Sequence, residues 1–198
     1  MLIVIEGLDG VGKSSLISEL QRDFYATKHI IPLVIHCQKP KCFIEEAEDF
    51  QKKYYEKLML ETIPELLGYD NGYNRIIILD RSWLGEHIWS KFRGGYSTLF
   101  IQEYEKRMMK IIDPRNNNTF MFLLEHSEVF LEKRYKDDGL SMFKTEEERK
   151  DCKAQFQFCF SESFIKNKHY IPVSSPDGNW FTRQEVFDII QLCMENKR

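Results

Sequence analysis

The sequence predicts an α/β protein, a three-layer α/β/α sandwich in which a five-stranded parallel sheet lies between two layers of helices. One observation behind this prediction is that short apolar runs alternate along the chain with longer stretches of helical character. Another is that most of these runs are continuous rather than alternating, which is typical of parallel strands covered on both faces. The expected strands are residues 2–6, 31–37, 75–80, 119–124 and 170–173.

Helical stretches separate the expected strands. The first opens over residues 14–20, where Leu16 and Leu20 lie on one face. The last begins at Thr182, a typical N-cap residue, and Glu185 three residues later completes a capping box. The helices between them are expected at residues 45–67, 96–112, 127–135 and 146–164.

Length and composition indicate how the chain is organised and where it works. With 198 residues, 42% of them hydrophobic and 30% charged, it suits a single globular domain, residues 1–198. Five cysteines without CxxC spacing predict reduced thiols, a cytoplasmic protein and no structural metal. No apolar run approaches the roughly 18 residues that span a membrane. The net charge of −3 disfavours a protein that coats nucleic acid.

The most specific motif follows the first expected strand directly. Residues 7–14 read Gly-Leu-Asp-Gly-Val-Gly-Lys-Ser and match the phosphate-binding loop pattern G-x-x-x-x-G-K-[ST] at every fixed position. The glycines let several backbone N–H groups point at one phosphate, and the next helix adds its dipole. Lys13 supplies a point charge for the outer phosphates, and the Ser14 hydroxyl suits Mg²⁺. The motif predicts a P-loop NTPase fold that binds a nucleoside triphosphate with magnesium.

A second charged group ends the third expected strand. Asp80 and Arg81 emerge at the carboxyl edge of the sheet, where the phosphate loop also lies. A carboxylate there can hold Mg²⁺ through water or orient an attacking hydroxyl, and an arginine can clamp a phosphate. The alternative is a surface salt bridge at a strand end, but the neighbouring phosphate loop favours the functional interpretation.

Three stretches resemble thymidylate kinases. Residues 5–14 are similar to the opening of that family, including the acidic Asp9 inside the loop, which deoxynucleoside kinases usually lack. Asp80-Arg81-Ser82 lies between the Asp-Arg-aromatic motif of thymidylate kinases and the Glu-Arg-Ser motif of deoxynucleoside kinases. Residues 122–134 resemble the fourth strand of thymidylate kinases and the helix that leads to their lid.

The resemblance implies an ATP- and Mg²⁺-dependent nucleoside monophosphate kinase of nucleotide biosynthesis, with a helical lid at about residues 133–145. Because Val11 stands where some thymidylate kinases have an arginine, Arg134 in the lid would supply the transition-state arginine; a solvated charged loop is the alternative there. The resemblance implies that the catalytic residues are Lys13, Asp80, Arg81 and Arg134, and that Ser14 and Asp80 bind the metal. ATP would be bound by Gly7, Asp9, Gly10, Val11, Gly12, Lys13, Ser14, Ser15 and Arg134.

The acceptor side departs from the family. Thymidylate kinases have Arg-Glu-Pro after the second strand and deoxynucleoside kinases have Glu-Pro, whereas residues 37–40 read Cys-Gln-Lys-Pro. Lys39 can replace a phosphate contact as a point charge but cannot reproduce a guanidinium fork. The aromatic and basic stretch 83–96 is expected to wall the acceptor pocket, with Arg93 as a further phosphate ligand. The expected acceptor-binding residues are Asp9, Lys39, Tyr54, Arg81 and Arg93.

Several aromatic residues near this site admit two interpretations. The ring of Tyr54 either stacks on a base or packs into the core with Phe50, four residues earlier on the same helix. Trp83 and Trp89 are either pocket wall or core, and His87 is interpreted as a surface histidine.

The acceptor itself stays open at this point. A pyrimidine deoxynucleoside monophosphate is the first candidate; a deoxynucleoside, or a modified base or strand end in DNA, are the alternatives. A GTPase switch is disfavoured, because residues 167–170 read Asn-Lys-His-Tyr and lack the aspartate of the guanine-binding motif. The resemblance also implies a homodimer as one form of assembly.

Overall fold

The fold rests on a computed structural model that describes residues 1–8, 10–37, 46–68, 75–92, 95–113, 118–130 and 145–196. Its centre is a five-stranded sheet with the strand order β2-β3-β1-β4-β5, and every pair of neighbouring strands is parallel. The strands are β1 (Leu2–Gly7), β2 (Leu33–His36), β3 (Ile77–Asp80), β4 (Thr119–Glu125) and β5 (Asn167–Pro172). The predicted parallel sheet is confirmed.

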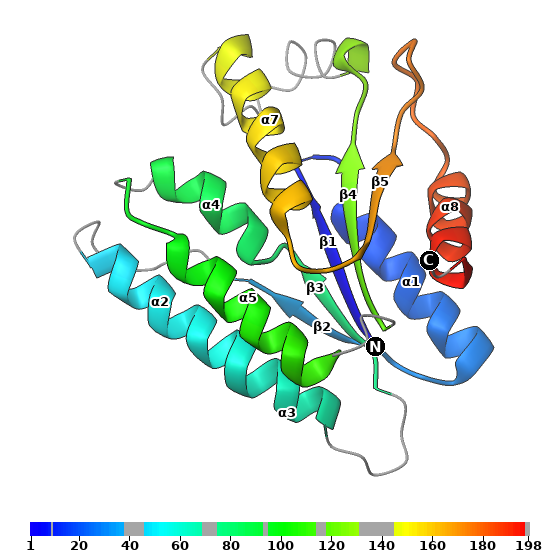
Figure 1. The fold of residues 1–198 in the computed structure, drawn as a ribbon. Coiled ribbons are helices and arrows are strands. Elements are labelled where there is room, and N and C mark those ends of the chain that lie inside the picture. The colour runs from blue at the N-terminus through cyan, green and yellow to red at the C-terminus, as the bar shows by residue number, and fades with distance from the viewer. Residues whose placement is uncertain are drawn as a thin grey trace.

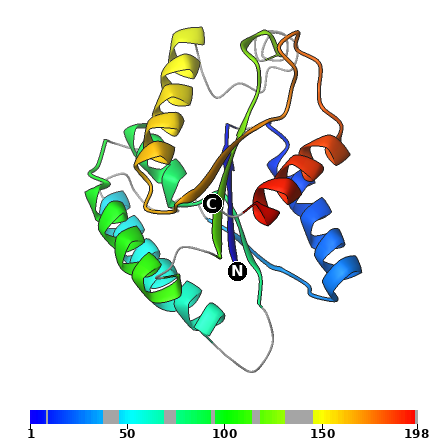
Figure 2. The same cartoon turned by 45° about the vertical axis from the view of Figure 1, so that its right-hand side comes forward.

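Helices cover both faces of the sheet, so the three-layer α/β/α sandwich is confirmed as well. One face carries α1 and α8, and the other carries α2, α3, α4, α5 and α7 (Figures 1 and 2). The helices are α1 (Lys13–Lys28), α2 (Ala47–Lys57), α3 (Ile63–Gly68), α4 (Trp83–Phe92), α5 (Leu99–Ile112), α7 (Glu146–Glu162) and α8 (Arg183–Glu195). Within the described ranges, no helix combines the length and the apolar character that crossing a membrane requires.

The order of the strands brings the two predicted motifs to one edge. All six residues of β1 are buried, and β1 lies between β3 and β4. Ile5 pairs with Asp80 in the parallel register of β1 and β3. The phosphate loop, which follows β1, and Asp80, which ends β3, therefore leave the sheet side by side, as the strand-end argument predicts.

Three strands begin elsewhere than the apolar runs suggest. The second strand begins at Leu33 rather than at residue 31, and the third begins at Ile77 rather than at residue 75. The fifth comprises Asn167–Pro172 rather than residues 170–173. As an edge strand, β5 has only one neighbour, so half-exposed and polar residues suffice along it. Its first residue is anchored by a side-chain bond, since the Asn167 amide donates to the Thr119 carbonyl at 3.1 Å. An apolar run could not indicate this start.

The long helix predicted over residues 45–67 is interrupted. A π-helical turn, η2 (Leu58–Thr62), separates α2 from α3. The buried face of α2 consists of Ala47, Gln51 and Tyr55, whereas Phe50 is 41% exposed. The prediction that Phe50 packs into the core is therefore wrong. The helix is rotated so that polar Gln51 faces the interior, where Glu86 of α4 accepts a hydrogen bond from its amide.

The segment before α5 also differs from its prediction. Tyr96 precedes the helix, which begins at Leu99, and its hydroxyl donates to the buried Glu86 carboxylate. Trp83 and Trp89 are buried, so they belong to the core rather than to a pocket wall. His87 is not a surface histidine: its Nδ1 lies 2.8 Å from Thr98 Oγ1, and burial lowers its pKa to about 4.

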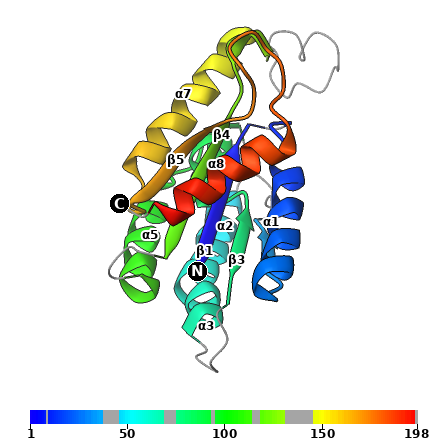
Figure 3. The same cartoon turned by 90° about the vertical axis from the view of Figure 1, so that its right-hand side faces the viewer.

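The C-terminal part of the chain closes over the carboxyl edge of the sheet. Residues 173–180 run beside residues 126–130 at the end of the molecule that holds the phosphate loop (Figures 1 and 3). The Ser127 amide donates to Ser174 Oγ at 2.8 Å, which ties the two segments together. Helix α8 then begins with the predicted capping box of Thr182 and Glu185. Of the helix predicted over residues 127–135, the described part ends at residue 130.

Candidate functional site: a phosphate loop beside a charged strand end

The phosphate loop has the backbone that its glycines predict. Gly7 has φ 142°, and a Cβ there would lie 2.7 Å from the Leu124 carbonyl oxygen, so a larger residue does not fit against β4. Gly12 has φ 88° and occupies the N-cap position of α1, where a left-handed residue turns the chain into the helix. Because the first N–H groups of a helix have no acceptor within the helix itself, this helix start suits the binding of an anion.

The side chain of Lys13 lies inside the phosphate loop and binds its backbone. It is the first residue of α1 and is buried. Its ammonium donates to the carbonyl oxygens of Gly7 and Leu8, each at 2.9 Å. The positive charge is thus held at the centre of the loop, next to where outer phosphates would lie. Ser14 follows it and is exposed at the helix start, so its hydroxyl is available to a metal.

Asp80 is a buried carboxylate at the end of β3. Its Oδ2 lies 2.8 Å from Nδ1 of His36, the last residue of β2, with which Asp80 also pairs in register. His36 was not predicted as a site residue. Its position at the end of the second predicted strand could have indicated it, because residues that end neighbouring parallel strands meet at one edge.

Arg81 stands in an unusual backbone conformation. Its φ of 66° is left-handed, which is uncommon for a residue other than glycine. Its N–H still donates to the Ile5 carbonyl at 3.1 Å, so the chain is held to β1 while it turns. Backbone strain of this kind gathers at functional sites.

Glu6 connects the loop to this turn and was also not predicted. It precedes Gly7, is 1% exposed, and its Oε1 accepts from the N–H of Ser82 at 2.5 Å, the hydroxyl of Ser82 at 2.6 Å and the N–H of Gly85 at 3.3 Å. Burial raises the pKa of this carboxyl, while these hydrogen bonds and the charge of Lys13 oppose the rise. The signal in the sequence was an acidic residue at the end of a buried apolar strand.

A buried polar network lies beneath the turn on the α2 side. The Gln51 amide donates to Glu86 at 3.3 Å, and the Tyr55 hydroxyl lies 3.5 Å from the Ser82 carbonyl. Tyr54, a predicted acceptor residue, packs edge-on against Tyr55 with ring centroids 5.0 Å apart. Its hydroxyl contacts the Cys37 thiol, whose pKa burial and nearby carboxylates raise to about 12, so this thiol cannot act as a base. The network packs amide, hydroxyl and aromatic groups beneath Ser82 and Glu86, in the segment that follows Arg81.

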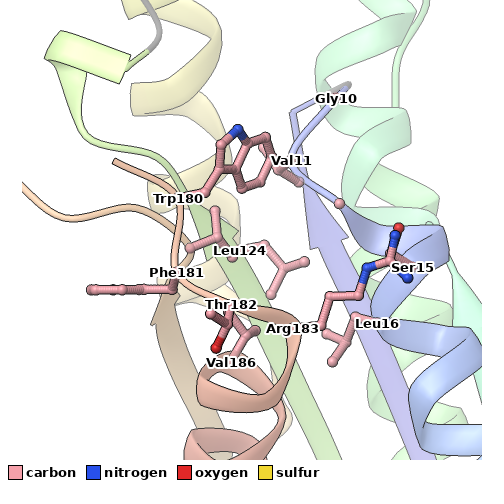
Figure 4. Close-up of a pocket in the computed structure, with 12 residues that line it drawn as sticks. Gly10, Val11, Ser15, Leu16, Leu124, Trp180, Phe181, Thr182, Arg183 and Val186 are labelled. Carbon is pink, nitrogen blue, oxygen red and sulfur yellow. The ribbon is translucent and has the colours of Figure 1, made fainter. Parts of the chain in front are cut away.

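A cavity of about 500 Å³ opens on the other side of the loop. Figure 4 shows Trp180 above Val11 at one wall and the side chain of Arg183 extending toward Ser15 at the other. Trp180 is 46% exposed and packs edge-on against His126 and Phe130, with centroids 4.5 and 4.6 Å away. The cavity is lined by Gly10, Val11, Gly12, Ser15, Leu16, Leu124, Val173, Trp180, Phe181, Thr182, Arg183 and Val186. Its aromatic and cationic walls suit a flat heterocycle attached to a phosphate chain in the loop.

The structure brings together the predicted residues that it describes, except Tyr54, which packs against Tyr55 on α2. The members gathered at the carboxyl edge of the sheet are Gly7, Gly10, Val11, Gly12, Lys13, Ser14, Ser15, Asp80 and Arg81. Asp9, Lys39, Arg93, Arg134 and residues 133–144 of the predicted lid lie outside the described residues. Among the residues described, no cluster of His, Cys, Asp or Glu forms a metal cage of its own. The Ser14 hydroxyl and the Asp80 carboxylate fit Mg²⁺, which takes few protein oxygens and completes its shell with phosphates and water.

Solved structures with this fold are thymidylate kinases and related proteins. The YorR protein of Bacillus subtilis, solved in complex with phosphorylated GDP, matches with a TM-score of 0.63 and 17% identity over 97% of this chain and 95% of its own. The thymidylate kinase of Candida albicans matches with a TM-score of 0.56 and 17% identity, covering 98% and 90%. The thymidylate kinase of Ehrlichia chaffeensis matches with a TM-score of 0.52 and 16% identity, covering 97% of both chains.

These likenesses establish the fold along nearly the whole chain: it is the P-loop kinase fold of thymidylate kinases. No protein-family model matches the sequence, and a comparison with curated proteins found no significant match. The function is therefore inferred from the arrangement of the residues in the site.

Proposed function

We propose that the protein is a P-loop phosphotransferase that moves the γ-phosphoryl group of ATP, with Mg²⁺, onto a deoxynucleotide, in the manner of a thymidylate kinase. One observation carries this proposal. The loop with Lys13 and Ser14 and the charged pair Asp80 and Arg81 leave neighbouring strands at one sheet edge, where Ile5 pairs with Asp80. A donor phosphate chain and an acceptor would meet between them. The likeness to thymidylate kinases supports a nucleotide as the acceptor.

In the proposed reaction, an oxygen of the acceptor forms a bond to the γ-phosphorus of ATP. The bond from that phosphorus to the β,γ-bridging oxygen breaks, and ADP leaves with its electron pair. The Ser14 hydroxyl and the Asp80 carboxylate would hold Mg²⁺, which would supply positive charge for the β- and γ-phosphate oxygens. Lys13 places a positive charge beside the same oxygens, and Arg81 binds the acceptor phosphate. Arg134 of the proposed lid adds a further positive charge that stabilises the transition state.

The acceptor determines what Asp80 must do. A monophosphate attacks with an oxygen that carries no proton at neutral pH, so no base is needed and Asp80 serves the metal. A hydroxyl acceptor loses a proton during the transfer, and Asp80 would receive it. We favour the monophosphate, because the acidic loop residue Asp9 and the Asp-Arg pair at the strand end both resemble thymidylate kinases.

A panel of acceptors tests this choice. The protein is incubated with Mg²⁺, ATP labelled in the γ-phosphate, and one acceptor at a time: deoxynucleoside monophosphates, deoxynucleosides, and unmodified or base-modified DNA. We expect label in a pyrimidine deoxynucleoside diphosphate. Label in a deoxynucleoside monophosphate would assign a deoxynucleoside kinase instead. Label in DNA alone, at a rate that falls steeply with salt, would assign a DNA kinase.

The cavity beside the loop is the proposed site of the donor base. Trp180 and Arg183 form two of its walls, and the phosphate loop forms the third. A base held there keeps its triphosphate directed into the loop. Trp180 is the exposed one of the three tryptophans, since Trp83 and Trp89 are buried. Its fluorescence should therefore respond to a ligand in the cavity.

Trp180→Ala is expected to raise the Kd for MgATP about tenfold, because stacking of a base on an aromatic ring contributes about 1–3 kcal/mol. In the wild type, MgATP should change the tryptophan fluorescence, and this change should vanish in the variant. Tyr170→Ala is the matched control, because Tyr170 is exposed to a similar degree (48% against 46%) but lies outside the cavity. An unchanged Kd in Trp180→Ala would place the base elsewhere.

A further inference from the structure

We propose that Glu6 is a positioning residue for the acceptor side of the site: its buried carboxylate holds the turn of residues 81–85 in place and thereby aims Asp80 and Arg81. This inference rests on the proposed phosphotransferase function but adds a residue to which nothing above assigns a role in the reaction. The geometry that carries it is a single carboxylate oxygen that accepts three hydrogen bonds from that turn.

The turn depends on side chains because it has left the sheet. Strand β3 ends at Asp80, and the last backbone bond between β1 and this segment runs from the Arg81 N–H to the Ile5 carbonyl. Beyond it, the backbone N–H groups of Ser82 and Gly85 both donate to Glu6. Without the carboxylate, two buried donors would lose their partner, which is costly in a protein interior.

Glu6 also caps helix α4 from across the sheet. The Ser82 hydroxyl accepts from the Leu84 N–H at 3.1 Å, as an N-cap residue does, and itself donates to Glu6. A negative carboxylate at this position also meets the positive end of the helix dipole. The start of α4 and the left-handed Arg81 before it are therefore fixed by one side chain.

The donor loop does not depend on the Glu6 side chain in the same way. The backbone of Glu6 is held by β4, since in the register of β1 and β4 Glu6 pairs with Leu123 and Gly7 with Leu124. Lys13 closes the loop through the carbonyls of Gly7 and Leu8. Loss of the carboxylate should therefore disturb the turn directly, whereas it affects the donor loop only through its charge on Lys13, whose two carbonyl contacts remain.

The test compares Glu6→Ala and Glu6→Gln with the wild type. We expect Glu6→Ala to lower kcat/KM for the acceptor by at least about tenfold while the Kd for MgATP stays within about twofold, since hydrogen bonds to a charged group are worth one or two factors of ten. Glu6→Gln should retain most of the activity, because its amide oxygen still accepts from Ser82. Amide hydrogen exchange at Ser82 and Gly85 should quicken in Glu6→Ala and less in Glu6→Gln.

Asp113→Ala is the matched control. Asp113, just beyond α5, is a buried carboxylate that accepts from the Asn118 N–H at 2.8 Å, at the end of the sheet opposite the phosphate loop. It should lower the melting temperature and leave acceptor kcat/KM unchanged.

Three results would overturn the inference: Glu6→Ala with wild-type kcat/KM and exchange, Glu6→Ala and Asp113→Ala with the same kinetic loss, or Glu6→Gln as impaired as Glu6→Ala. The last would mean that Glu6 takes part in the chemistry. A wild type that phosphorylates no acceptor would refute the proposed function instead, and the exchange measurement would still decide whether Glu6 holds the turn.

Discussion

Lys13→Ala is expected to abolish phosphoryl transfer, with a loss in kcat of about a thousandfold. The Lys13 ammonium is buried within the phosphate loop, bound to the carbonyls of Gly7 and Leu8 at 2.9 Å each. In the transition state it would stabilise charge that spreads over the transferred phosphoryl oxygens, and no other group of the loop carries a formal positive charge in the sequence of residues 7–14. Steady-state kinetics with the acceptor selected by the panel measure the loss.

The matched control for this variant is Lys28→Ala, a lysine in the last turn of the same helix that is exposed and lies over the Phe24 ring. It should keep the wild-type kcat. Circular dichroism and melting curves establish that Lys13→Ala is folded. A folded Lys13→Ala protein that transfers phosphate at the wild-type rate would remove the loop from the mechanism.

Asp80→Asn is expected to lower kcat about a hundredfold and to change the Kd for ATP little. The replacement keeps the shape of a buried side chain at the end of β3 but removes the charge that would hold Mg²⁺ or receive a proton. The contact with His36 Nδ1 at 2.8 Å can persist through the amide oxygen, so a loss of rate reports on charge rather than on folding.

Asp113→Asn provides the comparison for that variant. Asp113 is a buried aspartate just beyond α5, where its carboxylate accepts from the Asn118 N–H at 2.8 Å, and it lies apart from the phosphate loop. It should cost stability and leave kcat intact. If Asp80→Asn and Asp113→Asn have the same small kinetic effect, Asp80 is a structural residue.

The sequence predicted the parts of this protein that depend on local patterns. The buried central strands, the phosphate loop and the capping box of α8 each leave a signature within a few neighbouring residues, and each is confirmed. The meeting of Lys13 and Asp80 at one edge followed from a general rule for parallel sheets.

The features that the sequence could not indicate depend on tertiary packing. The rotation of α2, which exposes Phe50 and buries Gln51, is set by Glu86 of another helix. The interruption of the long helix does have a local mark in Pro64, which cannot donate to a carbonyl four residues earlier, but the π-helical form of the turn at Leu58–Thr62 was not predictable from it. The contacts on which the proposed roles of Glu6 and Trp180 rest join residues far apart in the sequence, as Glu6 and Ser82 are, so their partners could not be predicted.

The most direct test of the account is phosphorus NMR of the wild-type protein with ATP, Mg²⁺ and a pyrimidine deoxynucleoside monophosphate. We predict that the γ-phosphate signal of ATP falls while phosphoanhydride signals of a new nucleoside diphosphate rise in step with ADP. ATP that stays intact while bound, or that yields only inorganic phosphate with every acceptor of the panel, would contradict the assignment as a phosphotransferase.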